Sequence, residues 1–137
     1  MKTTLAAYLA TLLAFVLLDA LWLGLMMGPT YRAQLGSLLL EQPLPVPAVL
    51  FYLLYVLGCV SFAVLPALRQ GGWTRAARLG ALLGLVAYGT YDLSNWATLQ
   101  GWPASLALMD MAWGVLVSAL ACTFGYGCTQ RWGARRG

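Results

Sequence analysis

Four long apolar runs constrain this chain more than any other feature of its sequence. They cover roughly residues 4–27, 48–68, 77–98 and 105–127, and proline or glycine residues separate them. Each run is close to the ~20 residues that a helix needs to span the hydrocarbon core of a bilayer. The pattern predicts an all-α fold, an integral membrane bundle of four transmembrane helices, in which residues 1–137 form a single domain.

The composition agrees with a membrane protein. The chain is 61% hydrophobic and only 9% charged, and its mean hydropathy is +0.77. A soluble domain carries about 25% charged residues because it must present a solvated surface. The first run is too long for the core of a signal peptide and lacks a small-residue cleavage site, so we expect it to remain in the mature protein.

The placement of the basic residues predicts an orientation. If both termini lie on one side of the membrane, seven of the eight basic residues lie there too: Lys2, Arg69, Arg75, Arg78, Arg131, Arg135 and Arg136. Since Lys and Arg accumulate in cytoplasmic segments, we expect a multi-pass protein of the bacterial inner membrane with both termini in the cytoplasm. Basic residues in short flanks do not form a nucleic-acid groove, so no nucleic-acid partner is expected.

Three aspartates, Asp19, Asp92 and Asp110, lie inside the apolar runs. A carboxylate at the bilayer centre costs about 2.5–3.5 kcal/mol on insertion scales, so such residues usually face the protein interior or an aqueous cavity. In the expected topology they lie about 5, 7 and 9 Å to the outer side of their helix midpoints. We therefore expect the three acids to converge in one polar layer toward the outer leaflet.

The same layer has candidate hydrogen-bond partners for the acids. We expect Asn95, Tyr88 and Tyr55 to bond to them, because unpartnered carboxylates in hydrocarbon are too costly. Close carboxylates in a low dielectric cannot all stay ionised, so at least one is expected to carry a proton at neutral pH.

Small residues continue the faces that carry Asp92 and Asp110. The third run has Ala76, Gly80 and Gly84 in register with Tyr88, Asp92 and Asn95, and the fourth has Gly114, Ser118, Cys122 and Gly125 in register with Asp110. Small residues at this spacing let helices approach closely, so both acids should point into the bundle. The plainer alternative is that these faces serve packing alone, with each aspartate as an interhelical hydrogen-bond acceptor. Association with a second copy or with another membrane protein is also open.

Aromatic residues accompany each acid at helical spacing. Asp19 precedes Trp22 by three, Asp110 precedes Trp113 by three, and Asp92 lies four residues from both Tyr88 and Trp96. An acid beside an aromatic face suits an amine or a choline-like head group. The alternative is the interfacial belt of Trp and Tyr, which explains Trp73, Trp102 and Trp132 better than Trp113. The candidate binding residues are Asp19, Trp22, Tyr55, Tyr88, Tyr91, Asp92, Asn95, Asp110 and Trp113.

Several strings of the sequence resemble one family over essentially the whole chain. AYGTYDLSNWATL and ALMDMAWG, together with DALWLG in the first run and FYLLYVLGCVSFAVLPAL in the second, are similar to a bacterial four-helix membrane family known as domain of unknown function 2177. The resemblance implies a compact four-helix inner-membrane protein and names no reaction. Members are often encoded near lipid-modifying enzymes, which associates the family with lipid chemistry.

The residues favour binding over chemistry. Without histidine, the common zinc and haem ligands are missing, and we expect no cofactor and no metal. An oxygen-only site for Mg²⁺ or Ca²⁺ is the alternative that the acids allow. The Gly-x-Gly-Asp element of intramembrane aspartyl proteases does not precede Asp110. The cysteines Cys59, Cys122 and Cys128 lack metal-site spacing and are expected to be buried as small apolar residues.

The expected function is a binding site facing the outer leaflet. Its ligand would be the head group of a membrane lipid or a small, cationic molecule, or the protein would act as an accessory to membrane lipid metabolism. A small proton-coupled transporter and a lipid-modifying membrane enzyme stay open as alternatives, because buried carboxylates serve proton relays and acid–base work.

Overall fold

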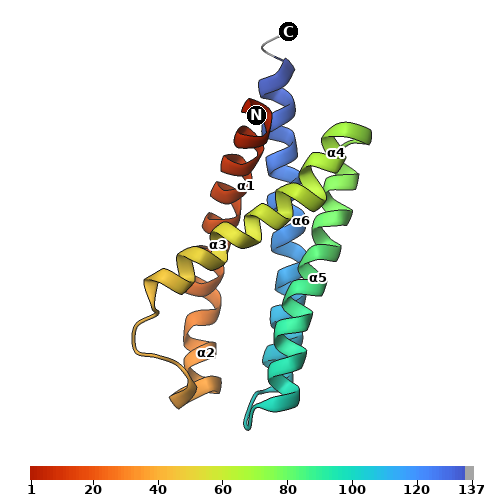
Figure 1. The fold of residues 1–137 in the computed structure, drawn as a ribbon. Helices are drawn as coiled ribbons and strands as arrows, with labels where there is room; N and C mark the ends of the chain where they lie inside the picture. The colour runs from red at the N-terminus through yellow and green to blue at the C-terminus, as the bar shows by residue number, and fades with distance from the viewer. Residues whose placement is uncertain (135–137) are drawn as a thin grey trace.

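The computed structural model describes the backbone of residues 1–134 and the side chains of residues 1–25 and 27–133. This part of the chain is all-helical (Figure 1), with no strand in it. The α-helices are α1 (Lys2–Leu21), α2 (Gly28–Leu35), α3 (Pro45–Cys59), α4 (Leu65–Gln70), α5 (Trp73–Thr98) and α6 (Ala104–Ala134).

Two π-helical segments join neighbouring helices without a break. Trp22–Met27 links α1 to α2, and Val60–Val64 links α3 to α4. Each segment comes just before a proline, Pro29 or Pro66. A proline ring lacks the N–H for the regular helical bond and clashes with the carbonyl four residues earlier, and a π-bulge relieves both conflicts while the helix continues. Pro29 therefore lies within a continuous helix, although the sequence reads it as the start of a connection.

The segment after α2 differs from either form that the sequence allows. The stretch YRAQLGSLLLEQ is expected from the sequence to be either a short amphipathic helix or a plain linker. In the structure its first part is helical and its second part is a connection. Its first residues complete α2, a 3₁₀ turn follows at Gly36–Leu38, and the chain then extends to Leu44 before α3 begins. Gly36 has a φ of 48°, which an L side chain rarely adopts, so a glycine ends α2 here.

The helices α5 and α6 run antiparallel in close contact, and α6 also packs against α1. Glycine makes the first contact possible, because a Cβ on Gly84 would fall on the backbone carbonyl of Gly114. Likewise, a Cβ on Gly125 would overlap the side chain of Thr11 on α1. The small-residue faces predicted from the sequence are confirmed as packing faces: Ala76, Gly80, Gly84, Asp92, Asp110, Gly114, Ser118, Cys122 and Gly125 are all buried.

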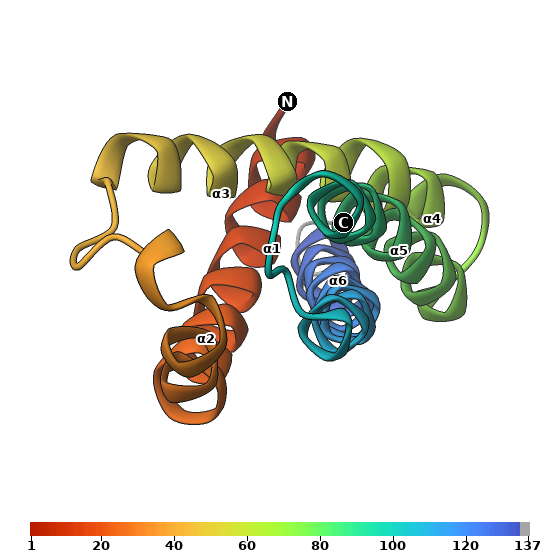
Figure 2. The same cartoon turned by 90° about the horizontal axis from the view of Figure 1, so that it is seen from below.

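The remaining long helix, α3 with α4, crosses α1 and α5 obliquely on one side of the bundle (Figure 2). Phe15 of α1 is fully buried at this crossing, with its ring 4.8 Å from that of Tyr55 and 6.0 Å from that of Tyr52. Cys59 and Cys122 are buried in the same core, as predicted, whereas Cys128 is only partly buried.

Within the described part of the chain, three helical stretches are long and apolar enough to cross a membrane: Lys2–Leu25, Pro45–Gln70 and Ala104–Gly133. The second and fourth predicted runs lie inside two of them, and the remaining stretch covers the first run as far as Leu25. The third run falls inside α5, which is 26 residues long. Its basic first turns and its polar last turns (Thr90, Asp92, Ser94, Asn95) lower its hydropathy relative to the others.

Both described ends of the chain and the α4–α5 connection lie at one end of the bundle, and α2 and the α5–α6 connection lie at the other (Figure 1). This arrangement agrees with placing both termini on one side of a membrane. Arg135 and Arg136, which contribute to the predicted orientation, fall outside the described residues.

Candidate functional site

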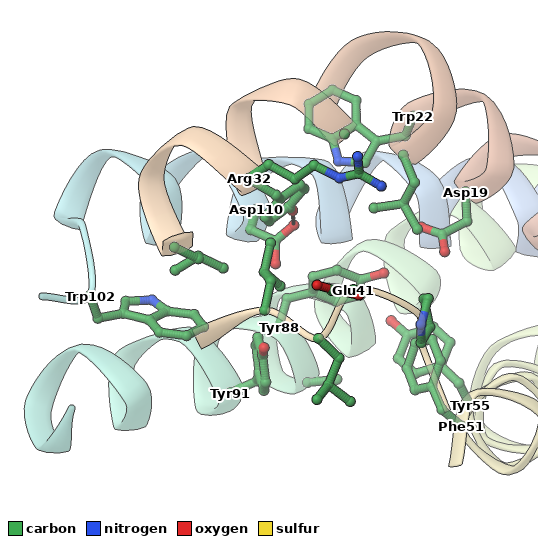
Figure 3. Close-up of a pocket in the computed structure, with 18 residues that line it drawn as sticks. Asp19, Trp22, Arg32, Glu41, Phe51, Tyr55, Tyr88, Tyr91, Trp102 and Asp110 are labelled. Carbon is green, nitrogen blue, oxygen red and sulfur yellow. Dashed lines mark hydrogen bonds between the residues drawn. The ribbon is translucent and has the colours of Figure 1, made fainter. Parts of the chain in front are cut away.

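A cavity of about 700 Å³ lies at the end of the bundle that carries α2. Helices α1, α2, α3, α5 and α6 and the segment before α3 contribute to its walls (Figure 3). Most of the 18 lining residues are aliphatic or aromatic, and four are charged: Asp19, Arg32, Glu41 and Asp110. In the close-up, Trp102 and Tyr91 lie toward one end of the cavity and Phe51 and Tyr55 toward the other.

Asp19 enters the cavity from α1 and is only 6% exposed. Its Oδ2 accepts a 2.6 Å hydrogen bond from the hydroxyl of Tyr52, and its Oδ1 accepts a 3.3 Å bond from the indole N–H of Trp113. Trp22, one turn after Asp19, stacks flat on Trp113 with the ring centroids 4.4 Å apart. Two donors from α3 and α6 thus stabilise a carboxylate of α1, because hydrogen bonds to a charged acceptor are stronger than neutral ones.

Asp110 enters the cavity from α6 and accepts a short hydrogen bond from the hydroxyl of Tyr31 on α2. This bond ties α2 over the cavity. Burial, followed by the hydrogen bond and the negative charge of Asp110, raises the pKa of the Tyr31 phenol well above its usual range. Tyr31 therefore keeps its proton and acts as a donor to Asp110.

Asp92 lies behind Asp110, on the face of α5 that packs against α6, and is fully buried. The two carboxyl groups lie near each other at the contact between α5 and α6. Within the described residues, no N–H or hydroxyl group donates to either oxygen of Asp92. The expectation that at least one of the acids carries a proton at neutral pH stays a prediction.

The structure brings most of the nine candidate residues to one place. The cavity lining includes Asp19, Trp22, Tyr55, Tyr88, Tyr91 and Asp110. The other three stand behind it: Asp92 against Asp110, Trp113 against Asp19, and Asn95 beside Tyr91.

The hydrogen-bond partners differ from those predicted. Tyr55 shares a 2.7 Å bond with Ser118, and Asn95 interacts with Tyr91, so the prediction that these residues bond to the acids is wrong. Tyr88 lines the cavity between the two acids without a hydrogen bond to either in the described structure. Trp113 follows Asp110 by three residues but donates to Asp19. The spacing along one helix predicts which side chains lie beside an acid on that helix, whereas the hydrogen-bond donors to Asp19 and Asp110 come from other helices.

Several residues of the site were not among the candidates, including Tyr31, Arg32, Glu41, Tyr52 and Trp102. Tyr52 lies three residues before the candidate Tyr55 in the second apolar run, and the sequence assigns Trp102 to the interfacial belt. Tyr31 and Arg32 lie in what the sequence reads as a connection. The one signal for them is Arg32 itself, the single basic residue on its predicted side of the membrane.

The positions of the acidic residues are relevant to the alternative of an oxygen-only site for Mg²⁺ or Ca²⁺. Among the described residues, no group of three or more His, Cys, Asp or Glu side chains could hold a metal ion. Asp92 and Asp110 form a pair, and Asp19 is held separately by Tyr52 and Trp113.

Comparison with known proteins gives one match. Residues 4–127 match the model of a family described as "Predicted membrane protein (DUF2177)". No curated protein and no solved structure matches the chain.

Proposed function

Because the chain belongs to the DUF2177 family of membrane proteins, we propose that its cavity binds the positively charged group of a lipid head group or of a small cationic molecule. One observation carries the proposal: Asp19 and Asp110 both face a cavity whose other walls are mainly aromatic and aliphatic. A cation entering this cavity meets carboxylates that are shielded from water, where their attraction is stronger than at an exposed surface.

The aromatic walls suit the same ligand. Tyr88, Tyr91 and Trp102 line the cavity near Asp110, and the rings of Tyr91 and Trp102 meet edge to face with centroids 5.8 Å apart. A cation over an aromatic face gains about 0.5–2 kcal/mol, most when both are desolvated. The volume of about 700 Å³ falls within the range of ~300–1,000 Å³ that is typical of small-molecule sites.

The proposal includes a fourth spanning helix and an orientation. Helix α5 is 26 residues long, or about 39 Å at 1.5 Å per residue, enough to cross the hydrocarbon core. Asp92, the one acidic residue of α5, is hidden from lipid because it faces α6. If the basic residues of the α4–α5 connection lie on the cytoplasmic side of a bacterial inner membrane, the cavity opens toward the outer leaflet.

Mass spectrometry of the purified protein tests the binding. We expect the wild-type protein to retain a lipid or small molecule bearing an ammonium group, and Asp19→Asn to lose it, because the substitution removes a charge and keeps the volume. Asp92→Asn is the matched control. Asp92 does not line the cavity, so the substitution leaves Asp19 and Asp110 in place, and ligand retention should stay the same or rise. Equal retention by all three proteins would refute the proposal.

A lipid-modifying enzyme is the second candidate, because Asp92 and Asp110 lie near each other beside the cavity, and two such carboxyl groups can serve as acid and base. Turnover of an added lipid, seen as a mass change that Asp92→Asn abolishes, would favour it over simple binding. A proton-coupled transporter would instead use Asp19 as the carboxyl group that exchanges protons for a cationic substrate. Substrate uptake into reconstituted vesicles, driven by a pH gradient and lost in Asp19→Asn, would identify that function.

A further inference from the structure

Arg32 gives the cavity a second kind of charge. It is the one basic residue among the 18 that line the cavity, and it reaches over the cavity from α2 (Figure 3). Three acidic residues, Asp19, Glu41 and Asp110, line the same cavity, yet in the described structure none of them forms an ion pair with Arg32. An arginine at such a site has five N–H donors left for an anion, in a planar arrangement that matches phosphate.

We infer that the ligand is a zwitterionic phospholipid, whose ammonium group binds between Asp19 and Asp110 and whose phosphate binds Arg32. This inference rests on the proposed function and makes its ligand more specific. The inference follows because the cavity is lined by both negative and positive side chains, and the positive one, Arg32, forms no ion pair in the described structure.

The order of the charges fits one head group. Arg32 directly follows Tyr31 in the chain, and the Tyr31 hydroxyl bonds to Asp110. The Arg32 side chain is exposed and lines the same cavity as Tyr31 and Asp110. A phosphate at Arg32 and an ammonium at Asp110 would lie at neighbouring positions, as the two groups of a phosphoethanolamine or phosphocholine do.

Single-charge ligands fit less well. An anionic lipid would satisfy Arg32 but would meet the repulsion of Asp19 and Asp110, and a purely cationic one would leave Arg32 uncompensated where the membrane lowers the dielectric. The walls beyond the charged groups can take acyl chains. They are formed by Leu23, Leu35, Leu39, Leu40, Pro43 and Phe51.

Native mass-spectrometric titration of the detergent-solubilised protein tests the inference. Three probes share the same acyl chains: phosphatidylethanolamine, phosphatidylglycerol, and a trimethylammonium-propane lipid that lacks the phosphate. We expect phosphatidylethanolamine to bind tightest. Arg32→Gln should weaken it about tenfold or more, since hydrogen bonds to a charged group contribute about 1.5–3 kcal/mol. The same variant should leave the affinity for the cationic lipid unchanged or higher.

Matched variants make the result specific. Arg69→Gln removes a positive charge from α4, at the other end of the bundle, and should change no affinity. Arg32→Lys keeps a phosphate-binding charge and should restore most of the phosphatidylethanolamine affinity, which shows that Arg32→Gln does not act by disturbing α2. Asp19→Asn should weaken both the zwitterionic and the cationic lipid.

The outcomes separate the inference from the proposed function. If the cationic lipid binds and depends on Asp19, but Arg32→Gln leaves phosphatidylethanolamine binding unchanged, the inference is overturned and the proposed function stands. If neither lipid responds to Asp19→Asn, both fail. Soluble glycerophosphoethanolamine should compete only at a concentration at least ~100-fold higher, because it lacks the apolar area that the walls bury. Competition at equal concentration would overturn the assignment to a lipid.

Discussion

At Asp19 a buried carboxylate depends on donors from two other helices. Tyr52 of α3 and Trp113 of α6 each give it one hydrogen bond, and the bond from Tyr52 is the shorter, at 2.6 Å. Removing one donor leaves the carboxylate partly unsatisfied in a low dielectric, which costs more than the loss of a hydrogen bond in water. The stability of the α1–α3 contact should therefore depend strongly on one hydroxyl group.

Tyr52→Phe should lower the free energy of unfolding by about 1.5–3 kcal/mol, because it deletes a donor to a buried charge and keeps the ring. Tyr8→Phe is the matched control. Tyr8 also joins α1 to α3, but its 3.0 Å bond goes to the exposed backbone oxygen of Leu53, so we expect about 0.5–1.5 kcal/mol. Denaturant titration in detergent measures both. If Asp19→Asn in the same protein does not reduce the effect of Tyr52→Phe, the two side chains are not coupled as described.

Tyr31 predicts a loss of stability at alkaline pH. Its folded pKa is raised above the ordinary value near 10 by burial and by Asp110, so above about pH 10 the folded state holds a proton that the unfolded state has released. The stabilisation is complete below pH 10 and falls as the pH rises further. The unfolding midpoint of the wild-type protein should therefore drop more between pH 9 and 11 than that of Tyr31→Phe. Equal slopes for the two proteins would contradict this assignment.

Single residues show what the sequence could reveal about the site. A lone aspartate in an apolar run is visible without a structure, and all three acids lie where the cavity is. Their partners were not visible, because helical spacing relates residues of one helix, whereas the donors Tyr31 and Tyr52 reach the acids from α2 and α3. Which helices meet, and at what height, is not encoded in local spacing.

Among the helices, the contact between α5 and α6 depends on the absence of side chains. A Cβ on Gly84 would meet the backbone of Gly114 and the hydroxyl of Ser118, and neither can move without separating the helices. This contact also sets the positions of Asp92 and Asp110, which lie farther along the same two faces. The geometry of the carboxyl pair therefore depends on the packing of the helices.

Gly84→Ala should destabilise the protein by about 1–3 kcal/mol, the usual effect of overpacking, and should separate Asp92 from Asp110. The control is Gly127→Ala on α6, where an added Cβ meets nothing within 4 Å. Because alanine is the better helix former, this control should be neutral or more stable by up to about 1 kcal/mol. Thermal unfolding of the two variants in detergent gives the comparison, and a neutral Gly84→Ala would refute the close contact.

The two π-segments show why the bounds of the helices were only partly predictable. Apolar length predicted where helices run, and residues 48–68 and 105–127 fall inside helices of the structure. Pro29 is a helix breaker by local rules, so the sequence reads a connection after it. The bulge at Trp22–Met27 absorbs the proline instead, and α2 continues to Leu35. This change in backbone geometry cannot be predicted from the side chains of the segment.

Over the whole molecule, the charged groups of the cavity gather at one end and most basic residues at the other. Arg69, Arg75 and Arg78 flank the α4–α5 connection, whereas Asp19, Arg32 and Asp110 surround the cavity. If α5 spans the membrane, the positive-inside rule places the cavity on the outer side. If α5 does not cross the membrane, both of its ends are accessible from one side. The two arrangements differ in where residue 100 lies.

Labelling of single cysteines decides between them. In a background with Cys59, Cys122 and Cys128 replaced by alanine, Ser37→Cys, Thr74→Cys and Gln100→Cys each place a thiol at an exposed position in or beside a connection. We expect a membrane-impermeant maleimide to label positions 37 and 100 on intact spheroplasts, and position 74 only after permeabilisation. Labelling of 74 and 100 on the same side would exclude α5 as a spanning helix. Labelling of 74 alone on intact cells would reverse the orientation and open the cavity to the cytoplasm, where the lipid bound by Asp19, Asp110 and Arg32 would come from the inner leaflet.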